Sequence, residues 1–291
     1  MNDGAPVLTL EEVSKSFGPV QALQDVDFEV RPGEVVALVG DNGAGKSTLV
    51  KAIAGIHSID GGRIAFEGRP VKVSTPTDAV NLGIATVYQD LALCDNLDVV
   101  ENLFLGREER SVGLATITRQ LDETSMERQA HELLDNLAVT ITDVRSEVGT
   151  MSGGQRQQVA IARSLLGEPK VVLLDEPTAA LGVRQTAQVL ALIKRLRDKG
   201  HGVVVISHNL SNVFEVADRI VVLRLGRVAA VYDAKETTHE EVVGAITGAS
   251  DPSTGELGPA VDEVMGAARR RDQPGEQPDG EPRERETGGT A

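Results

Sequence analysis

The residues of this chain that could do chemistry begin with the stretch GDNGAGKST at residues 40–48. It fits the pattern G-x-x-x-x-G-K-[ST], with Gly40, Gly45, Lys46 and Ser47 at the fixed positions. Glycines let a backbone curl around a phosphate with its N–H groups turned inward, a lysine reaches the β- and γ-phosphates, and a serine hydroxyl ligates Mg²⁺. A buried apolar run precedes the stretch and a helical pattern follows it, which is the context that this chemistry needs. The stretch therefore predicts a nucleotide phosphate site.

Two later apolar runs end in polar side chains that suit the same chemistry. KVVLLDEP, residues 170–177, ends in Asp175 and Glu176, and GVVVISH, residues 202–208, ends at His208. At the carboxyl ends of parallel strands these side chains would reach the crevice where α/β sheets bind ligands. There Asp175 can hold Mg²⁺ through water, Glu176 can polarise an attacking water, and His208 can donate to a γ-phosphate. Taken singly, each also fits a solvated strand end or a structural role, and Gln89, after GIATVY, fits a polar surface position.

A second glycine turn lies within MSGGQRQQVAIARSL, residues 151–165. It opens directly into a helical pattern, and the N–H groups at such a helix start form another place for a phosphate. The chain thus carries two candidate phosphate sites, or cradles, at residues 40–48 and 152–155, and only the first contains a lysine.

The elements that must position these residues alternate along the chain. Strand patterns cover residues 5–30, 34–40, 60–68, 170–177, 202–208 and 218–231, and helical patterns cover 47–55, 75–83, 125–138, 155–166 and 186–200. Alternation of this kind predicts an α/β fold with a mainly parallel sheet. The region from 94 to 168 is polar with helical periodicity, and we interpret it as an insert.

Composition limits the alternatives. The 291 residues include 41% hydrophobic but only 2% aromatic residues, so the core is expected to be aliphatic, and the single cysteine, Cys94, excludes an internal disulfide. A net charge of −15 argues against general nucleic-acid binding. We expect no signal peptide and no membrane span, since no apolar run approaches the ~20 residues that a bilayer requires. Residues 249–291 hold five of the twelve prolines, and we predict that they form a disordered acidic tail.

Together these motifs resemble the ATP-binding cassette (ABC) ATPases, the motor subunits of membrane transporters, over roughly residues 7–248. The resemblance implies a P-loop NTPase core with an N-terminal antiparallel β subdomain and a helical insert subdomain. It divides an ATPase domain at 5–248 into a nucleotide-binding core, 5–93 and 169–248, and a helical signature subdomain, 94–168. It implies catalytic roles for Glu176, His208, Lys46 and Gln89 and a Mg²⁺ site of Ser47, Gln89 and Asp175. The residues that it implies for ATP contact are Phe17, Gly40, Asp41, Asn42, Gly43, Ala44, Gly45, Lys46, Ser47, Thr48, Ser152, Gly153, Gly154 and Gln155.

The resemblance also implies a reason for the second cradle. In this family two ATPase domains face each other head to tail, and the signature of one, here Ser152 to Gln155, completes the γ-phosphate site of the other. This chain would then pair with a second copy or a relative. One departure is Gly182, in EPTAALG, where the family usually has an aspartate, which puts the cross-dimer contact of that aspartate in doubt.

Segments such as VQALQDVDFEVRPGEVVALVGDNGAGKSTL and DEPTAALG look like the ATPases of bacterial monosaccharide importers of the ribose, xylose and fructose group. That group implies a permease dimer and an extracellular sugar-binding protein as partners, and a peripheral place on the cytoplasmic face of the bacterial membrane. Alternatives are an exporter ATPase for a drug or lipid, a cassette ATPase acting on ribosomes or DNA, and a regulatory protein with an inactive site. Intact Lys46, Asp175, Glu176 and His208 argue against the last.

Overall fold

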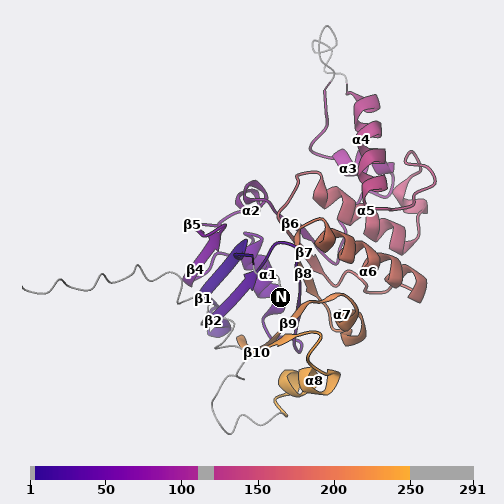
Figure 1. Cartoon of the computed structure of the whole chain (residues 1–291). Coiled ribbons are helices and arrows are strands. Elements are labelled where there is room, and N and C mark those ends of the chain that lie inside the picture. The colour runs from indigo at the N-terminus through magenta and orange to yellow at the C-terminus, as the bar shows by residue number, and fades with distance from the viewer. Residues whose placement is uncertain (1–3, 111–120, 250–291) are drawn as a thin grey trace, which may run out of the picture.

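The computed structural model describes residues 4–110 and 121–249. The predicted tail, apart from Ala249, therefore lies outside the described residues. Within them the chain forms two sheets, with helices packed around them (Figure 1).

A six-stranded sheet forms the centre, in the order β10-β9-β3-β8-β7-β6. All neighbouring pairs are parallel except β9 with β10, which form an antiparallel hairpin. The strands of β3, β8 and most of β7 are buried on both faces, which explains why they are continuous apolar runs in the sequence. The bounds are β3 Val35–Val39, β6 Ile84–Val87, β7 Val171–Asp175, β8 Gly202–Ile206, β9 Arg219–Arg224 and β10 Arg227–Asp233.

A separate antiparallel sheet has the order β2-β1-β4-β5 and lies to the left in Figure 1. Its strands are β1 Leu8–Phe17, β2 Val20–Val30, β4 Gly61–Phe66 and β5 Arg69–Val71. The hairpin between β1 and β2 turns at Gly18, where φ is +57°.

Helices fill the remaining layers. They are α1 Lys46–Ile53, α2 Pro76–Leu82, α3 Val99–Phe104, α4 Glu123–Asn136, α5 Gly153–Leu165, α6 Val183–Asp198, α7 Leu210–Val216 and α8 His239–Thr247, with a short 3₁₀ turn at Val148–Thr150. In Figure 1, α3, α4 and α5 gather at the end away from the antiparallel sheet, and α8 lies beside β10 at the bottom. None of the helices in the described part is long and apolar enough to cross a membrane.

The core divides according to the period-two alternation of the central strands. Val171 and Leu173 of β7 pack in the cluster that includes the antiparallel sheet, α1 and α2. Val172 and Leu174 of the same strand pack against α3, α4, α5 and α6. A smaller cluster joins the β9–β10 hairpin to α7 and α8. The sheet is therefore covered on both faces, and its strand ends remain available for a site.

The predicted fold class is confirmed, and three short helices are additions to it. The sequence prediction did not include α3, α7 and α8, of six, seven and nine residues. Two of them carry a signal that could have revealed them, because Asp98 with Glu101 and Thr238 with Glu241 form reciprocal capping boxes.

Candidate nucleotide site

The phosphate loop, residues 40–48, joins β3 to α1 in a conformation that requires glycine. Gly40 and Gly45 have φ values of +149° and +106°. A Cβ added at Gly40 would lie 2.2 Å from the carbonyl oxygen of Leu223, and one at Gly45 would lie 2.7 Å from that of Ala22. The loop therefore lies so close to β9 and β2 that no side chain fits at position 40 or 45. Asp41, Asn42 and Gly43 form the exposed crest of the loop, whereas Ala44 is buried.

Lys46 spans the loop from the first turn of α1. Its Nζ donates hydrogen bonds to the carbonyl oxygens of Gly40, at 2.7 Å, and Asp41, at 2.9 Å. Burial lowers the pKa of Lys46, while the carboxylates of Glu176, Asp41 and Asp175 act to raise it. The Lys46 ammonium is therefore held against the backbone of the phosphate loop, and the carboxylates of Asp175 and Glu176 at the end of β7 favour its charged form. Ser47 and Thr48, exposed and half-buried, follow it on α1.

Asp175 and Glu176 lie where β7 ends. Asp175 pairs with Ile206 of β8, and the backbone N–H of Glu176 donates to the carbonyl oxygen of Ile206 at 3.0 Å. Glu176 has φ +49°, so the chain turns sharply out of the sheet at this residue. Burial, followed by the Glu176 carboxylate, raises the pKa of Asp175, and Lys51 and Lys46 act in the opposite direction.

His208 meets Glu176 directly. Its Nδ1 lies 2.9 Å from Oε1 of Glu176, with the His208 side chain 75% exposed and that of Glu176 16% exposed. The two line a hollow of about 270 Å³ together with Thr178, Ala179, Ala180, Leu181, Ser207, Asn209 and Asn212. The sequence analysis did not single out the other polar residues of this lining, which are Thr178, Ser207, Asn209 and Asn212. Asn209 carried a detectable signal, because it caps α7 as the asparagine before the helical pattern LSNVFEV.

The donor set suits Mg²⁺. Among the residues that the structure describes, no group of three or more His, Cys, Asp or Glu side chains could hold a metal by itself. Mg²⁺ bound to a nucleotide needs no such cage, since it takes one or two protein oxygens and completes its shell with phosphate and water. Asp175, whose raised pKa reflects a buried carboxylate beside a second one, fits a divalent cation. Ser47 follows the loop, and exposed Gln89 lies two residues beyond β6, whose end pairs with that of β7.

The signature turn, residues 152–155, belongs to the helical part. Ser152 is the N-cap of α5, its hydroxyl accepts a hydrogen bond from the backbone N–H of Gln155, and its own N–H donates to Oε1 of Gln155. Gly153, Gly154 and Gln155 begin α5 directly after this cap, with Gly154 buried and Gly153 half-buried.

Phe17 and Gly182 complete the predicted set. Phe17 ends β1 with 44% of its surface exposed, its ring 5.1 Å from that of His57 and 5.5 Å from Nζ of Lys15. Gly182 is the N-cap of α6 and offers no side chain to it; its N–H donates to Oε1 of Gln185 at 3.1 Å.

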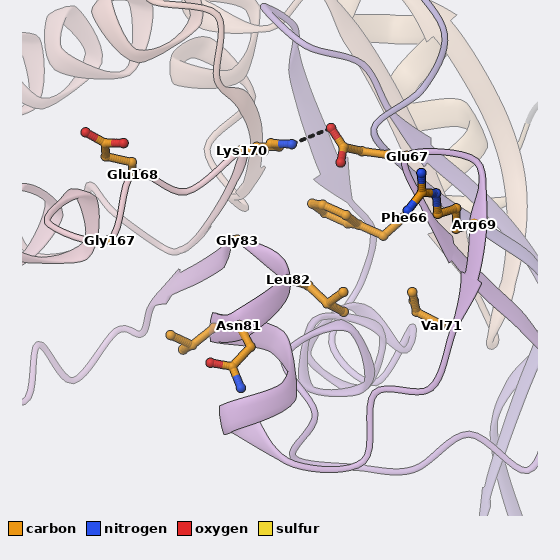
Figure 2. A pocket seen from close by; sticks show the side chains of 11 residues that line it. Phe66, Glu67, Arg69, Val71, Asn81, Leu82, Gly83, Gly167, Glu168 and Lys170 are labelled. Carbon is orange, nitrogen blue, oxygen red and sulfur yellow. Dashed lines mark hydrogen bonds and ion pairs between the residues drawn. The ribbon is translucent and has the colours of Figure 1, made fainter.

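A second hollow, of about 440 Å³, lies at the other end of the central strands. Figure 2 shows its wall, where Lys170 pairs with Glu67 beside Phe66. Gly83 and Lys170 precede β6 and β7, so this hollow is at the amino ends of the parallel strands. Ligands of open α/β sheets bind at the carboxyl ends, and the hollow holds none of the predicted site residues.

The fold and this arrangement define a class of protein. A family model described as ABC transporter matches residues 23–179, more than half of the chain. The structure is similar to the ADP conformation of an ATP-binding cassette of an ABC transporter, with a TM-score of 0.71, 27% identity and coverage of 90% of this chain and 98% of that one. It is also similar to a dimeric cassette in a post-hydrolysis state bound to ADP and Pi, with a TM-score of 0.64, 25% identity and coverage of 79% and 100%. The chain belongs to the ABC transporter ATPases, and this prediction from its motifs is confirmed.

Curated relatives narrow the class. The chain is 47% identical over 249 residues to the fructose import ATP-binding protein FrcA of Rhizobium meliloti, covering 85% of this chain and 96% of that protein. It is 46% identical over 241 residues to the xylose/arabinose import ATP-binding protein XylG of Sulfolobus acidocaldarius, covering 83% and 94%. Against the ribose import ATP-binding protein RbsA 1 of Rubrobacter xylanophilus it is 41% identical over 271 residues, which are 93% of this chain but 50% of that protein. All three are named as import proteins, which favours the predicted importer over the exporter alternative.

Proposed function

We propose that this chain is the ATP-hydrolysing motor of an importer that takes up a pentose or hexose through a partner permease. The observation that carries the proposal is the meeting of Lys46, Asp175, Glu176 and His208 at the carboxyl ends of β3, β7 and β8. Support for sugar as cargo comes from relatives named for fructose, xylose/arabinose and ribose import. The sugar itself would never touch this chain.

The geometry supports a division of labour in hydrolysis. The loop N–H groups and Lys46 hold the β- and γ-phosphates, with Lys46 exchanging the carbonyl oxygens of Gly40 and Asp41 for phosphate oxygens. Mg²⁺, held by Ser47 and Asp175 with Gln89 beside it, would neutralise charge on the β- and γ-phosphates. Glu176 orients a water and accepts its proton as the water oxygen bonds to the γ-phosphorus and the bond to the β-phosphate oxygen breaks. His208 donates to the γ-phosphate, and Phe17 stacks on the adenine.

The pair between His208 and Glu176 has a consequence for this cycle. The contact joins Nδ1 of His208 to Oε1 of Glu176 at 2.9 Å, so a hydrogen bond from His208 to the γ-phosphate would use Nε2 or require the ring to turn away from Glu176. The 75% exposure of the His208 side chain leaves room for such a turn.

Assembly follows from the two cradles. Ser152, Gly153, Gly154 and Gln155 of one chain would close on the ATP held by the phosphate loop of a second chain, head to tail. The likeness to a dimeric cassette supports this pairing. A homodimer so formed would dock on a permease dimer at the cytoplasmic face of the bacterial membrane, supplied by an extracellular sugar-binding protein.

The test is transport by cells that lack this gene, measured with a panel of labelled pentoses and hexoses. We expect loss of uptake of one sugar, restored by the wild-type gene and by Lys235→Ala, at an exposed position, but not by Lys46→Ala. Unchanged uptake of every sugar, together with increased sensitivity to a drug, would overturn the proposal in favour of the exporter alternative.

A further inference from the structure

The signature turn is seated directly on the start of α6. A Cβ added at Gly154 would lie 2.7 Å from Cβ and 2.9 Å from Cγ of Gln185, and one added at Gly153 would lie 3.3 Å from Cδ2 of Leu181. Neither glycine has a positive φ. Glycine is therefore required at Gly154 for close approach to Gln185, independently of any phosphate that the turn binds.

Gln185 is itself held in place by the loop that precedes α6. Its Oε1 accepts the hydrogen bond of the Gly182 N–H at 3.1 Å, and its side chain is half-buried. Because Gly182 has no side chain to cap the helix, Gln185 reaches back to that N–H from within the first turn. The Gln185 side chain thus accepts the hydrogen bond of Gly182 through Oε1 and packs against Gly154 through Cβ and Cγ.

The contact of Gly154 with Gln185, which we call the seat of the signature turn, lies a few residues after β7 and Glu176 in the sequence. Glu176 and Gly182 are joined by a tight loop with backbone hydrogen bonds from Ala179 N to Glu176 O and from Leu181 N to Thr178 O. Leu181, which contacts Gly153, also lines the hollow beside Glu176 and His208. Residues 177–185 therefore connect Glu176, in the chain's own site, to the signature turn, which would act on the ATP of the second chain.

We propose that Gln185 is a positioning residue that sets the angle of the signature turn against this loop. The inference rests on the proposed function in one respect, that the signature turn acts on the ATP of the second chain. Loss of the Gln185 side chain should then weaken the site in the partner more than the site in its own chain. The backbone bond of Glu176 to Ile206 and its pair with His208 do not involve Gln185, so we expect both to remain when Gln185 is truncated.

Mixed dimers purified through two different tags test this directly, with the KM for ATP and kcat as readouts. The reference dimer pairs a wild-type chain with a Lys46→Ala chain, so that only one phosphate loop works. In the second dimer the Lys46→Ala chain also carries Gln185→Ala, so the working loop meets the altered signature turn. In the third dimer Gln185→Ala is in the chain with the working loop, which meets an intact signature turn.

We expect the second dimer to show a KM for ATP raised about three- to tenfold over the reference, the effect of losing one partly buried hydrogen bond. We expect the third to stay within about twofold of the reference. Equal values for all three dimers, or an equal loss in the second and third, would overturn the inference. Absence of hydrolysis by the wild-type dimer would instead overturn the proposed function.

Two single-site variants in the second dimer separate positioning from general damage. Gln185→Glu keeps the stem on Gly154 and an acceptor for the Gly182 N–H, so it should restore the reference KM. Gln188→Ala, at an exposed position on the same helix, should match the reference as well. If Gln185→Glu weakens the site as much as Gln185→Ala while the melting temperatures of both equal that of the wild type, Gln185 does not act through this seat.

Discussion

The two glycine turns of this chain are shaped by different neighbours. In the phosphate loop, Gly40 and Gly45 have positive φ values and meet backbone carbonyl oxygens of β9 and β2. In the signature turn, Gly153 and Gly154 meet the side chains of Leu181 and Gln185. The glycines of the phosphate loop thus pack against main-chain atoms, which we call the wall of main chain, and those of the signature turn pack against side chains, the wall of side chains.

This difference indicates how each cradle can change. A wall of strand backbone in a sheet is fixed by the whole ladder of hydrogen bonds, so no side chain fits at Gly40 or Gly45 without moving a strand. A wall of side chains can move with the helix that carries it. We therefore expect the signature turn to be able to shift with α6 and the loop after Glu176, as the proposed closure on a second chain would require.

The largest expected effect tests whether both cradles close on one nucleotide. Glu176→Gln removes the proposed proton acceptor for water, so ATP hydrolysis should fall about a hundredfold to a thousandfold. The variant should form a stable ATP-bound dimer, measured by analytical ultracentrifugation with and without ATP. Glu168→Gln, at an exposed position, is the matched control and should hydrolyse ATP normally. A Glu176→Gln variant that stays monomeric in ATP would mean that the signature turn is not a second cradle.

The next effect concerns the wall of main chain. Gly40→Ala places a Cβ 2.2 Å from the carbonyl oxygen of Leu223 at φ +149°, and should lower the free energy of unfolding by about 3 kcal/mol or more. Gly43→Ala in the same loop has φ +79° but no atom within 4 Å, and should cost only about 1 kcal/mol. Urea unfolding of the two variants checks this, and equal losses would show that β9 does not constrain the loop.

A smaller effect is expected at the wall of side chains. Gly154→Ala pushes α5 against Gln185 and should cost about 1–3 kcal/mol in the same assay. Gln185→Gly removes both contacting atoms, Cβ and Cγ, so the double variant should be less destabilised than the sum of the two single variants. Simple additivity of the two losses would contradict the close packing of α5 on α6.

The smallest effect concerns the charge at the end of β7. Since burial and Glu176 raise the folded-state pKa of Asp175, its ionised form destabilises the nucleotide-free protein, and stability falls as pH rises through that pKa. Asp175→Asn should raise the melting temperature at pH 7 by about 1–2 °C, a gain that shrinks as pH falls toward the unfolded-state value of 3.8. The added stability from ATP and Mg²⁺ should be lost in the same variant. A lower melting temperature without nucleotide would show that Lys46 and Lys51 more than offset the burial of this carboxylate.

Much of this protein could be predicted because its chemistry depends on local sequence. Loop 40–48 lies between a buried strand and a helix, and those elements are encoded by neighbouring residues. Apolar runs such as VVLLD revealed strands buried on both faces, and in a parallel sheet their carboxyl ends had to meet at one edge. Asp175, Glu176 and His208 could therefore be grouped from the sequence alone.

The tertiary structure alone decided which of these groups touch and which residues support them. The Glu176–His208 pair depends on β7 and β8 being adjacent and on the turn of the chain at Glu176. The seat of Gly154 on Gln185 joins positions 31 residues apart, on two helices whose packing no local pattern encodes. Spacing along the chain determines what a segment can form, but contact between segments depends on how their side chains fill the space between them.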